Sequence, residues 1–199
     1  AAMITIEQGK ILLAIARASI AQALGQDGEK PDTAILDQDW LQQKAASFVT
    51  LTQHGQLCGC IGTLEARRSL LDDVTNNARA AAFQDSRFAP LTVEELDRTD
   101  IEVSVLSPMQ AMEFPDEQQA LQQLQPGIDG LVFECGHYRS TFLPQVWDQL
   151  PEASDFMAHL KQKAGLPADF WSDDVKLYRY TVNKWKERDF TEQHEEQTA

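Results

Sequence analysis

A cysteine flanked by glycines is the feature of this sequence with the clearest capacity for chemistry. Cys60 lies in the segment Gly59-Cys60-Ile61-Gly62-Thr63, at the end of an apolar, strand-like run. Because glycine has no Cβ, a ligand or another backbone can approach the thiol closely from either side. A nucleophilic or redox-active cysteine needs its pKa pulled below about 8.5 by a cation or a helix N-terminus. Arg87 is our first candidate for that cation, and the alternative is a buried cysteine that packs beneath a hairpin.

Two polar residues on a second predicted strand could complete such a site. Residues 101–106 alternate, with Ile101, Val103 and Val105 on one side and Glu102 and Ser104 on the other. Glu102 could serve as a general base and Ser104 as a hydrogen-bond donor to a ligand. The alternative is an ordinary solvated face of a sheet.

Candidates for ligand contact also lie near Leu143-Pro144, where a helix could begin. Thr141 and Gln145 flank this point, and the free N–H groups of a helix start can bind an anion. For Gln145 the alternative is a capping role. Arg87 likewise has a structural alternative, an ion pair with Asp85 in the loop Asp85-Ser86-Arg87-Phe88.

Metal and nucleotide sites have weaker support. Cys58-x-Cys60 and Cys135-x-His137 offer zinc ligands, but these spacings are not the common ones for zinc. The sequence has no glycine-rich phosphate loop and no dinucleotide fingerprint. We therefore expect no metal and no cofactor.

Charge and composition exclude several classes of partner. The chain has 31 acidic and 17 basic residues and a net charge of −14, so we expect no binding to the phosphate backbone of nucleic acid. No apolar run reaches the length of a membrane span, and the N-terminus lacks the order of a secretory signal. Three cysteines, an odd number, are typical of a reducing compartment, and we expect a cytoplasmic protein.

The elements that must position these residues are a mixture of helices and hairpins. Helical spacing predicts a helix over residues 5–24, a second that Ser69 caps, and a third that Ser154 caps. Turn residues predict two hairpins, one that delivers Cys60 and one around Gly136-His137. Residues 175–185 alternate as a further strand, and residues 188–199 form a polar tail. Without strict strand–helix alternation, the class is α+β with largely antiparallel sheets.

Six motifs in order resemble one known family. They are Phe48-Val49-Thr50-Leu51, Gly59-Cys60-Ile61-Gly62-Thr63, Asp85-Ser86-Arg87-Phe88, residues 101–106, Leu143-Pro144-Gln145-Val146 and Lys163-Ala164-Gly165-Leu166. In this order they are similar to the AMMECR-type domain family, and most of all to protein A of AmmeMemoRadiSam gene systems. The resemblance implies a single α+β domain over residues 1–187, with a larger and a smaller lobe around a cleft. Cys58 stands where the family usually has an arginine.

The resemblance also implies partners but no established reaction. It implies a Memo-type protein and a radical SAM enzyme as neighbours in a pathway. We expect a small-molecule-binding or thiol-dependent component of that pathway, without deciding whether it is an enzyme. The alternative is a non-catalytic interaction adaptor with a structural cysteine. The residues that we expect to contact a ligand are Gly59, Gly62, Thr63, Ser104, Thr141 and Gln145.

Overall fold

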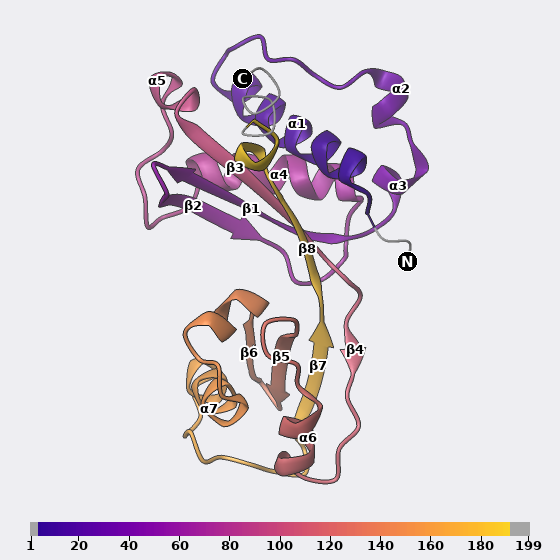
Figure 1. Cartoon of the computed structure of the whole chain (residues 1–199), viewed down its shortest axis with the longest axis vertical. Helices are drawn as coiled ribbons and strands as arrows, with labels where there is room; N and C mark the ends of the chain where they lie inside the picture. The colour runs from indigo at the N-terminus through magenta and orange to yellow at the C-terminus, as the bar shows by residue number, and fades with distance from the viewer. Residues whose placement is uncertain (1–3, 192–199) are drawn as a thin grey trace, which may run out of the picture. The chain divides into compact units, whose positions relative to one another are not determined.

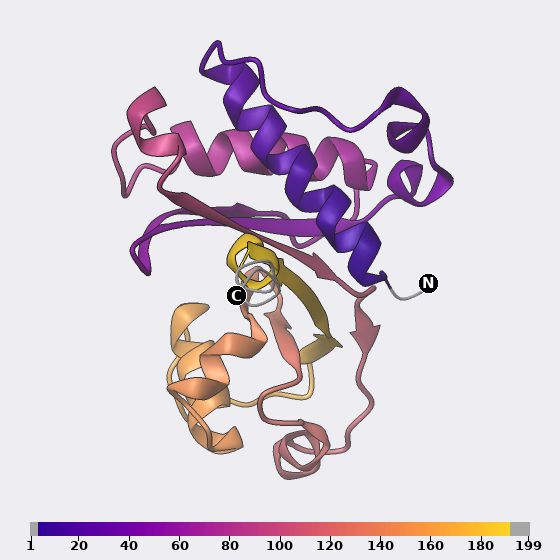
Figure 2. The ribbon, with the colours of Figure 1, turned by 45° about the horizontal axis from the view of Figure 1, so that its top comes forward.

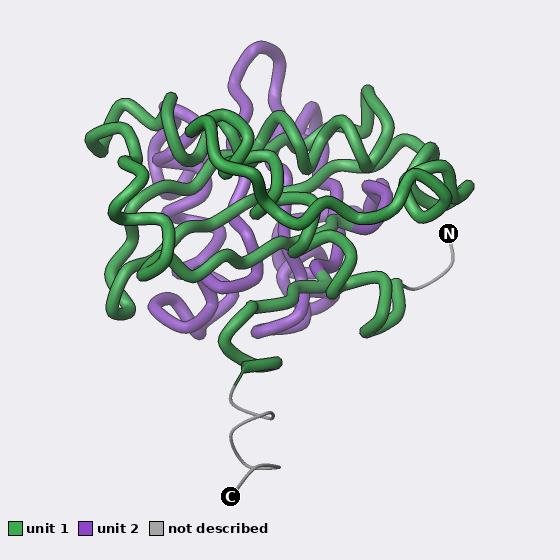
Figure 3. Tube along the Cα trace, turned by 90° about the horizontal axis from the view of Figure 1, so that it is seen from above, with its two compact units in different colours: residues 1–106, 183–199 green, residues 107–182 purple. Residues whose placement is uncertain are grey.

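The computed structural model describes residues 4–191 and divides the chain into two compact units. Unit 1 comprises residues 1–106 and 183–199, and unit 2 comprises residues 107–182 (Figure 3). Each unit contains one four-stranded sheet with antiparallel strand pairs, together with helices. The chain is therefore of the α+β class, as the sequence predicts.

The sheet of unit 1 has two long helices on one face. Its strand order is β2-β1-β3-β8. The strands are β1 (Ala46–Gln53), β2 (Gln56–Gly62), β3 (Thr99–Leu106) and β8 (Val182–Lys186). Helices α1 (Ile6–Ala23) and α4 (Leu70–Phe83) lie together on one side of this sheet (Figures 1 and 2). The short helices of the unit are α2 (Thr33–Leu36), α3 (Asp39–Gln42) and α5 (Val93–Leu96).

Local sequence explains where the two long helices begin. Thr5 and Gln8 form a capping box, in which each side chain bonds the other's backbone N–H, at 3.1 and 2.9 Å. Ser69 caps α4 by accepting a hydrogen bond from the N–H of Asp72. Both starts were predicted from the sequence and are confirmed.

The hairpin that carries Cys60 has a tight turn. His54 and Gly55 connect β1 to β2 with φ angles of 51° and 77°, the left-handed pair typical of a two-residue hairpin. This turn sets the register, in which Thr50 of β1 lies opposite Cys60 of β2. On its other side β1 pairs with β3, and Thr50 lies opposite Glu102.

Unit 2 packs its helices around a second apolar core. Its sheet order is β4-β7-β5-β6. The strands are β4 (Gln110–Ala111), β5 (Gly130–Cys135), β6 (Tyr138–Phe142) and β7 (Lys176–Tyr180), and the helices are α6 (Glu117–Gln123), the 3₁₀ helix η1 (Pro144–Asp148) and α7 (Ala153–Lys163). Trp147 of η1 stacks on Phe156 of α7 with ring centroids 3.8 Å apart. Leu131 and Phe133 of β5 are fully buried in the same core.

The structure corrects three details of the predicted elements. The strand expected over residues 175–185 is two strands, β7 and β8, which belong to different sheets and are separated at Thr181. Helix α7 begins one residue before Ser154, and its N-cap is Glu152. The start at Pro144 is a 3₁₀ helix of five residues.

The C-terminal segment is partly helical. Residues 187–191 are helical, and Phe190 packs against the core of unit 1. The expected polar tail over residues 188–199 lies outside the described residues from position 192 onward. Among the described residues, no helix has the length and apolarity to span a membrane.

Candidate functional site

A row of three side chains crosses the sheet of unit 1 on one face. Cys60, Thr50 and Glu102 lie directly opposite one another on β2, β1 and β3. Neighbouring residues of β1 and β3 point the other way, where Val49 and Val103 are fully buried in the core with α1 and α4. Side chains alternate along a strand, so the row lies on the face turned away from α1 and α4. We call this the outer face.

The backbone of Cys60 is held from outside the sheet by the loop that follows α4. Its N–H donates to Asp85 Oδ2 at 3.0 Å, and its carbonyl oxygen accepts from Arg87 Nη2 at 3.3 Å. Arg87 also binds Asp85 through two parallel hydrogen bonds, of 3.0 and 2.7 Å. Because the N–H and carbonyl of Cys60 bond to this loop and not to β1, Cys60 and Thr50 form a non-hydrogen-bonded antiparallel pair. In such a pair the side chains lie closer together than in a hydrogen-bonded pair. The Thr50 Oγ1 and Cys60 Sγ atoms lie 3.2 Å apart.

This arrangement does not activate the thiol. Burial raises the pKa of Cys60, and the negative charges of Glu102 and Asp85 act in the same direction. The Thr50 hydrogen bond and the Arg87 charge act to lower the pKa, but they do not outweigh burial. The sequence favours Arg87 as the cation that lowers this pKa. Arg87 is instead engaged by Asp85, whose carboxylate offsets the guanidinium charge, and the thiol is neutral at neutral pH.

Glu102 has a buried carboxylate oxygen without a hydrogen-bond partner among the described residues. Its Oε1 is buried and accepts no hydrogen bond among the described residues. The nearest cations belong to β8, with Lys184 Nζ at 4.0 Å and Lys186 Nζ at 3.9 Å. These distances exceed those of a hydrogen bond, and a buried acceptor left unpaired costs about 1–3 kcal/mol. The oxygen therefore has a free-energy incentive to accept a hydrogen bond from a donor outside the chain.

The two glycines beside Cys60 have packing roles in this structure. A Cβ on Gly59 would overlap the backbone of Ala81 in α4, and a Cβ on Gly62 would overlap the ring of Phe48. Phe48 also lies opposite Ser104, so Gly62, Phe48 and Ser104 form a second row on the outer face. The close approach predicted from the glycines is made by the protein itself, and ligand contact at Gly59 and Gly62 stays a prediction.

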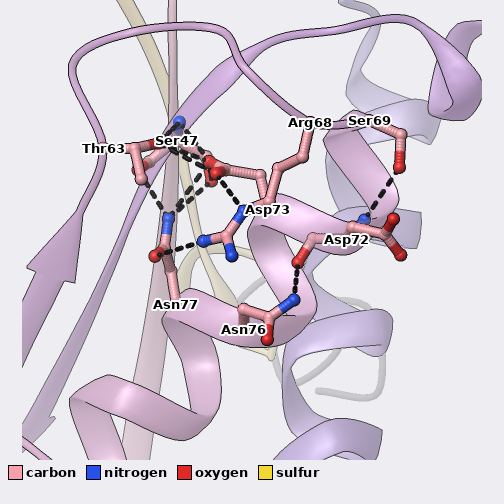
Figure 4. A network of polar contacts seen from close by, with 8 residues as sticks. All are labelled: Ser47, Thr63, Arg68, Ser69, Asp72, Asp73, Asn76 and Asn77. Atoms are coloured by element: carbon pink, nitrogen blue, oxygen red, sulfur yellow. Dashed lines mark hydrogen bonds and ion pairs between the residues drawn. The ribbon is translucent and has the colours of Figure 1, made fainter.

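Thr63 belongs to a buried polar network that is not among the residues predicted from the sequence (Figure 4). At its centre is Asp73 of α4, which is 1% exposed. The carboxylate accepts from Ser47 N at 2.8 Å, Ser47 Oγ at 2.6 Å and Thr63 Oγ1 at 2.8 Å. It also accepts from Arg68 Nε at 2.8 Å and Asn77 Nδ2 at 3.1 Å.

This Asp73 network ties the start of β1 and the end of β2 to α4. All of its donors belong to unit 1, and they supply the charge and hydrogen bonds that a buried carboxylate requires. A sequence signal did exist, because Asp73 and Asn77 are four residues apart within the buried stripe of α4.

Thr141 and Gln145 belong to unit 2. The hydroxyl of Thr141 lies 3.0 Å from both the Leu131 carbonyl and the Tyr180 hydroxyl. Gln145 is exposed in η1, and a five-residue 3₁₀ helix offers no extended array of N–H groups to an anion. The structure brings Cys60, Arg87, Glu102 and Ser104 together in unit 1, and ligand contact at Thr141 and Gln145 stays a prediction.

The cysteines and histidines form no metal cluster in the described part of the chain. No group of three or more His, Cys, Asp or Glu side chains there is placed to hold a metal ion. Cys58 lies at a bulge of β2, and its thiol is 3.4 Å from the carbonyl of Gln56. Cys135 belongs to the other unit.

Comparison with known proteins gives one consistent result. The AMMECR1 family model matches residues 13–185. Protein MJ0810 of Methanocaldococcus jannaschii is 34% identical over 195 residues, which cover 93% of this chain and 92% of that protein. Protein PYRAB00100 of Pyrococcus abyssi is 36% identical over 199 residues, 94% and 93% of the two chains. The crystal structure of the uncharacterized protein PH0010 from Pyrococcus horikoshii matches with a TM-score of 0.80 at 34% identity, over 92% of this chain and 93% of that chain.

Proposed function

We propose that this chain, which belongs to the AMMECR1 family, binds a small polar molecule on the outer face of its first sheet. The observation that carries the proposal is the buried Oε1 of Glu102, which has no hydrogen-bond partner among the described residues. Native proteins pair nearly all buried polar atoms, and an exception points to strain, catalysis or a missing molecule. A ligand N–H or O–H group is the partner that this oxygen lacks.

The neighbouring residues indicate the chemistry of the ligand. Lys184 and Lys186 place two ammonium groups 4.0 and 3.9 Å from Oε1, and their side chains are 51% and 34% exposed. On the other side of Glu102, Thr50 and Cys60 offer a hydroxyl and a neutral thiol. A ligand that donates a hydrogen bond to Glu102 and presents an acceptor or an anionic group to the two lysines would pair both the carboxylate and the ammonium groups.

Binding is better supported than thiol catalysis. The thiolate is the nucleophilic form of cysteine, and burial raises the pKa of Cys60. The cation nearest to it, Arg87, is committed to Asp85 and to the Cys60 carbonyl. Cys60 then acts as a weak hydrogen-bonding group in the wall of the site, and Asp85 and Arg87 act as positioning residues that hold its strand.

The resemblance of the six sequence motifs to protein A of AmmeMemoRadiSam systems supports the wider setting of this proposal. In that setting the ligand is a substrate, product or intermediate of a pathway that also uses a Memo-type protein and a radical SAM enzyme. The neutral Cys60 thiol also favours a second candidate, an adaptor with a structural cysteine. In an adaptor, a side chain of a partner protein would donate to Glu102.

The experiment is an analysis of small molecules retained through native purification. The protein is isolated without denaturant, then unfolded, and the released compounds are identified by liquid chromatography and mass spectrometry. Glu102→Gln replaces one carboxylate oxygen by a donor and should lose the compound. Glu94→Gln makes the same chemical change on exposed α5 and should retain it.

The adaptor function predicts a different pattern. In that case no compound co-purifies with the wild type. Glu102→Gln instead weakens binding of the chain to the Memo-type or radical SAM protein. Equal amounts of the same compound from wild type and Glu102→Gln would contradict the proposed site.

A further inference from the structure

A polar pocket lies entirely within unit 2. Its volume is about 270 Å³, below the usual 300–1,000 Å³ of ligand pockets, so only a small molecule fits. The lining residues come from the start and end of the unit, from β4 and β7, and from the loop after α6. They are Ser107, Gln110, Gln125, Asp129, Arg179, Tyr180 and Thr181.

The wall formed by Ser107 and Thr181 is held by reciprocal hydrogen bonds. Ser107 N donates to the Thr181 carbonyl at 2.8 Å, and Thr181 N donates to Ser107 Oγ at 2.8 Å. The hydroxyl of Tyr180, another lining residue, is fixed by Thr141 and the Phe142 carbonyl, at 3.0 and 3.1 Å. The polar wall is therefore preorganised, which lowers the entropic cost of binding.

One cation and one anion of the pocket are anchored near the end of α6. Arg179 Nη1 donates to the carbonyl of Gln123 at 3.0 Å, and Asp129 Oδ2 accepts from the N–H of Gln125 at 2.8 Å. Asp129 is 3% exposed. The two anchoring residues, Gln123 and Gln125, are only two positions apart in the chain.

Both charged groups keep bonding capacity after they are anchored. Within the described residues, Nε and Nη2 of Arg179 make no hydrogen bond, and neither does Oδ1 of Asp129. The two side chains also form no ion pair with each other in that part of the chain, although both line the pocket. A guanidinium with two free N–H groups on one edge binds a carboxylate through parallel bonds, and a carboxylate oxygen accepts from an ammonium group.

We infer that this pocket binds a free α-amino acid. Its carboxylate meets the free edge of Arg179, and its ammonium group meets Asp129 Oδ1. The remaining lining groups are neutral hydroxyls, amides and one phenol ring, which favours a small polar side chain. A zwitterion satisfies both charged groups at once, whereas a simple anion or a simple amine leaves one of them unpaired.

The test compares ligands that differ by one charged group. Binding of L-serine, L-glutamine, ethanolamine and 3-hydroxypropionate to the full chain is measured by saturation-transfer NMR and titration calorimetry. L-Serine or L-glutamine should bind saturably. Ethanolamine, which lacks the carboxylate, and 3-hydroxypropionate, which lacks the ammonium group, should each bind about tenfold more weakly or worse, because each leaves a charged group unpaired.

Variants assign the binding to this pocket. Arg179→Gln should reduce amino-acid affinity by about tenfold or more, and Arg179→Lys should recover only part of it, since an ammonium cannot form the parallel pair. Arg188→Gln, an exposed arginine of unit 1, is the matched control and should bind as the wild type does.

Three results would overturn the inference. They are the absence of saturable binding of both amino acids to the wild type, binding of a truncated analogue as tight as that of the amino acids, and unchanged affinity in a folded Arg179→Gln variant. If Arg179→Gln fails to fold, the comparison of analogues on the wild type still decides. Glu102→Gln should leave amino-acid binding unchanged, so this inference and the proposed function can fail independently.

Discussion

Replacing Gly59 by alanine should destabilise unit 1 more than the same change at Gly62. At Gly59 a new Cβ would lie 3.0 Å from the carbonyl carbon of Ala81 and nearer still to its oxygen. Both groups are backbone, so relief requires β2 and α4 to separate. Helix α4 is not free to move, because Asp73 fixes it to β1 and to Thr63.

The magnitude follows from two opposing effects. Overpacking that forces a backbone shift costs about 1–3 kcal/mol, and the upper end applies here because two anchored elements must part. Removing glycine lowers the entropy of the unfolded chain and returns about 0.4–1 kcal/mol. We therefore expect Gly59→Ala to lower the free energy of unfolding by about 2 kcal/mol.

Gly62→Ala is the matched control on the same strand. Its Cβ would meet the ring of Phe48, a half-buried side chain on the outer face that can turn away. The loss should be about 1 kcal/mol or less after the same entropic gain. Urea unfolding followed by circular dichroism measures both variants. A Gly59→Ala variant as stable as Gly62→Ala would refute the packing argument for Gly59.

Three further predictions follow from pKa directions. Burial raises the pKa of Cys60. In a Cys58→Ser background, the rate of Cys60 alkylation should therefore still increase with pH above about pH 8.5. A rate that becomes constant below about pH 8.5 would contradict the raised pKa. Hydrogen bonds from Arg87 and from the Cys60 N–H hold the pKa of Asp85 well below its usual range. The stabilisation that Asp85 contributes is present above the unfolded pKa of about 3.9 and is lost as pH falls through the folded pKa. The melting temperature of Asp85→Asn should therefore fall less steeply in acid than that of the wild type. Parallel curves of melting temperature against pH for the two proteins would count against this prediction. Burial raises the pKa of Tyr180 to about 12, so stability should decline above about pH 10, where the unfolded phenol ionises, and Tyr180→Phe should weaken that decline.

Local patterns in the sequence predict most of the helices and strands, and they predict which face of β3 carries Glu102 and Ser104. The capping box at Thr5 and the cap at Ser69 predict α1 and α4, because a cap satisfies N–H groups that a helix start leaves free. Alternation over residues 101–106 predicts correctly that Glu102 and Ser104 share the face opposite Val103. The break at Thr181 could not be predicted, since it depends on a hydrogen bond from Thr181 N to Ser107 Oγ, 74 residues away.

The chemical state of the site required the structure. The sequence suggests Arg87 as a cation for Cys60, but the same loop also supplies Asp85, which binds Arg87 and the Cys60 N–H. Whether Arg87 or burial decides the thiol pKa depends on geometry that spacing does not contain. Whether Glu102 Oε1 accepts a hydrogen bond likewise depends on its distances from the ammonium groups of Lys184 and Lys186.

The most direct measurement of the central claim is a crystal structure of the protein as isolated, at a resolution that shows ordered water. We predict a non-protein molecule on the outer face of the first sheet, with a donor atom about 2.7–3.2 Å from Glu102 Oε1. The claim is contradicted if Oε1 instead accepts a direct hydrogen bond from Lys184 or Lys186, or from water alone.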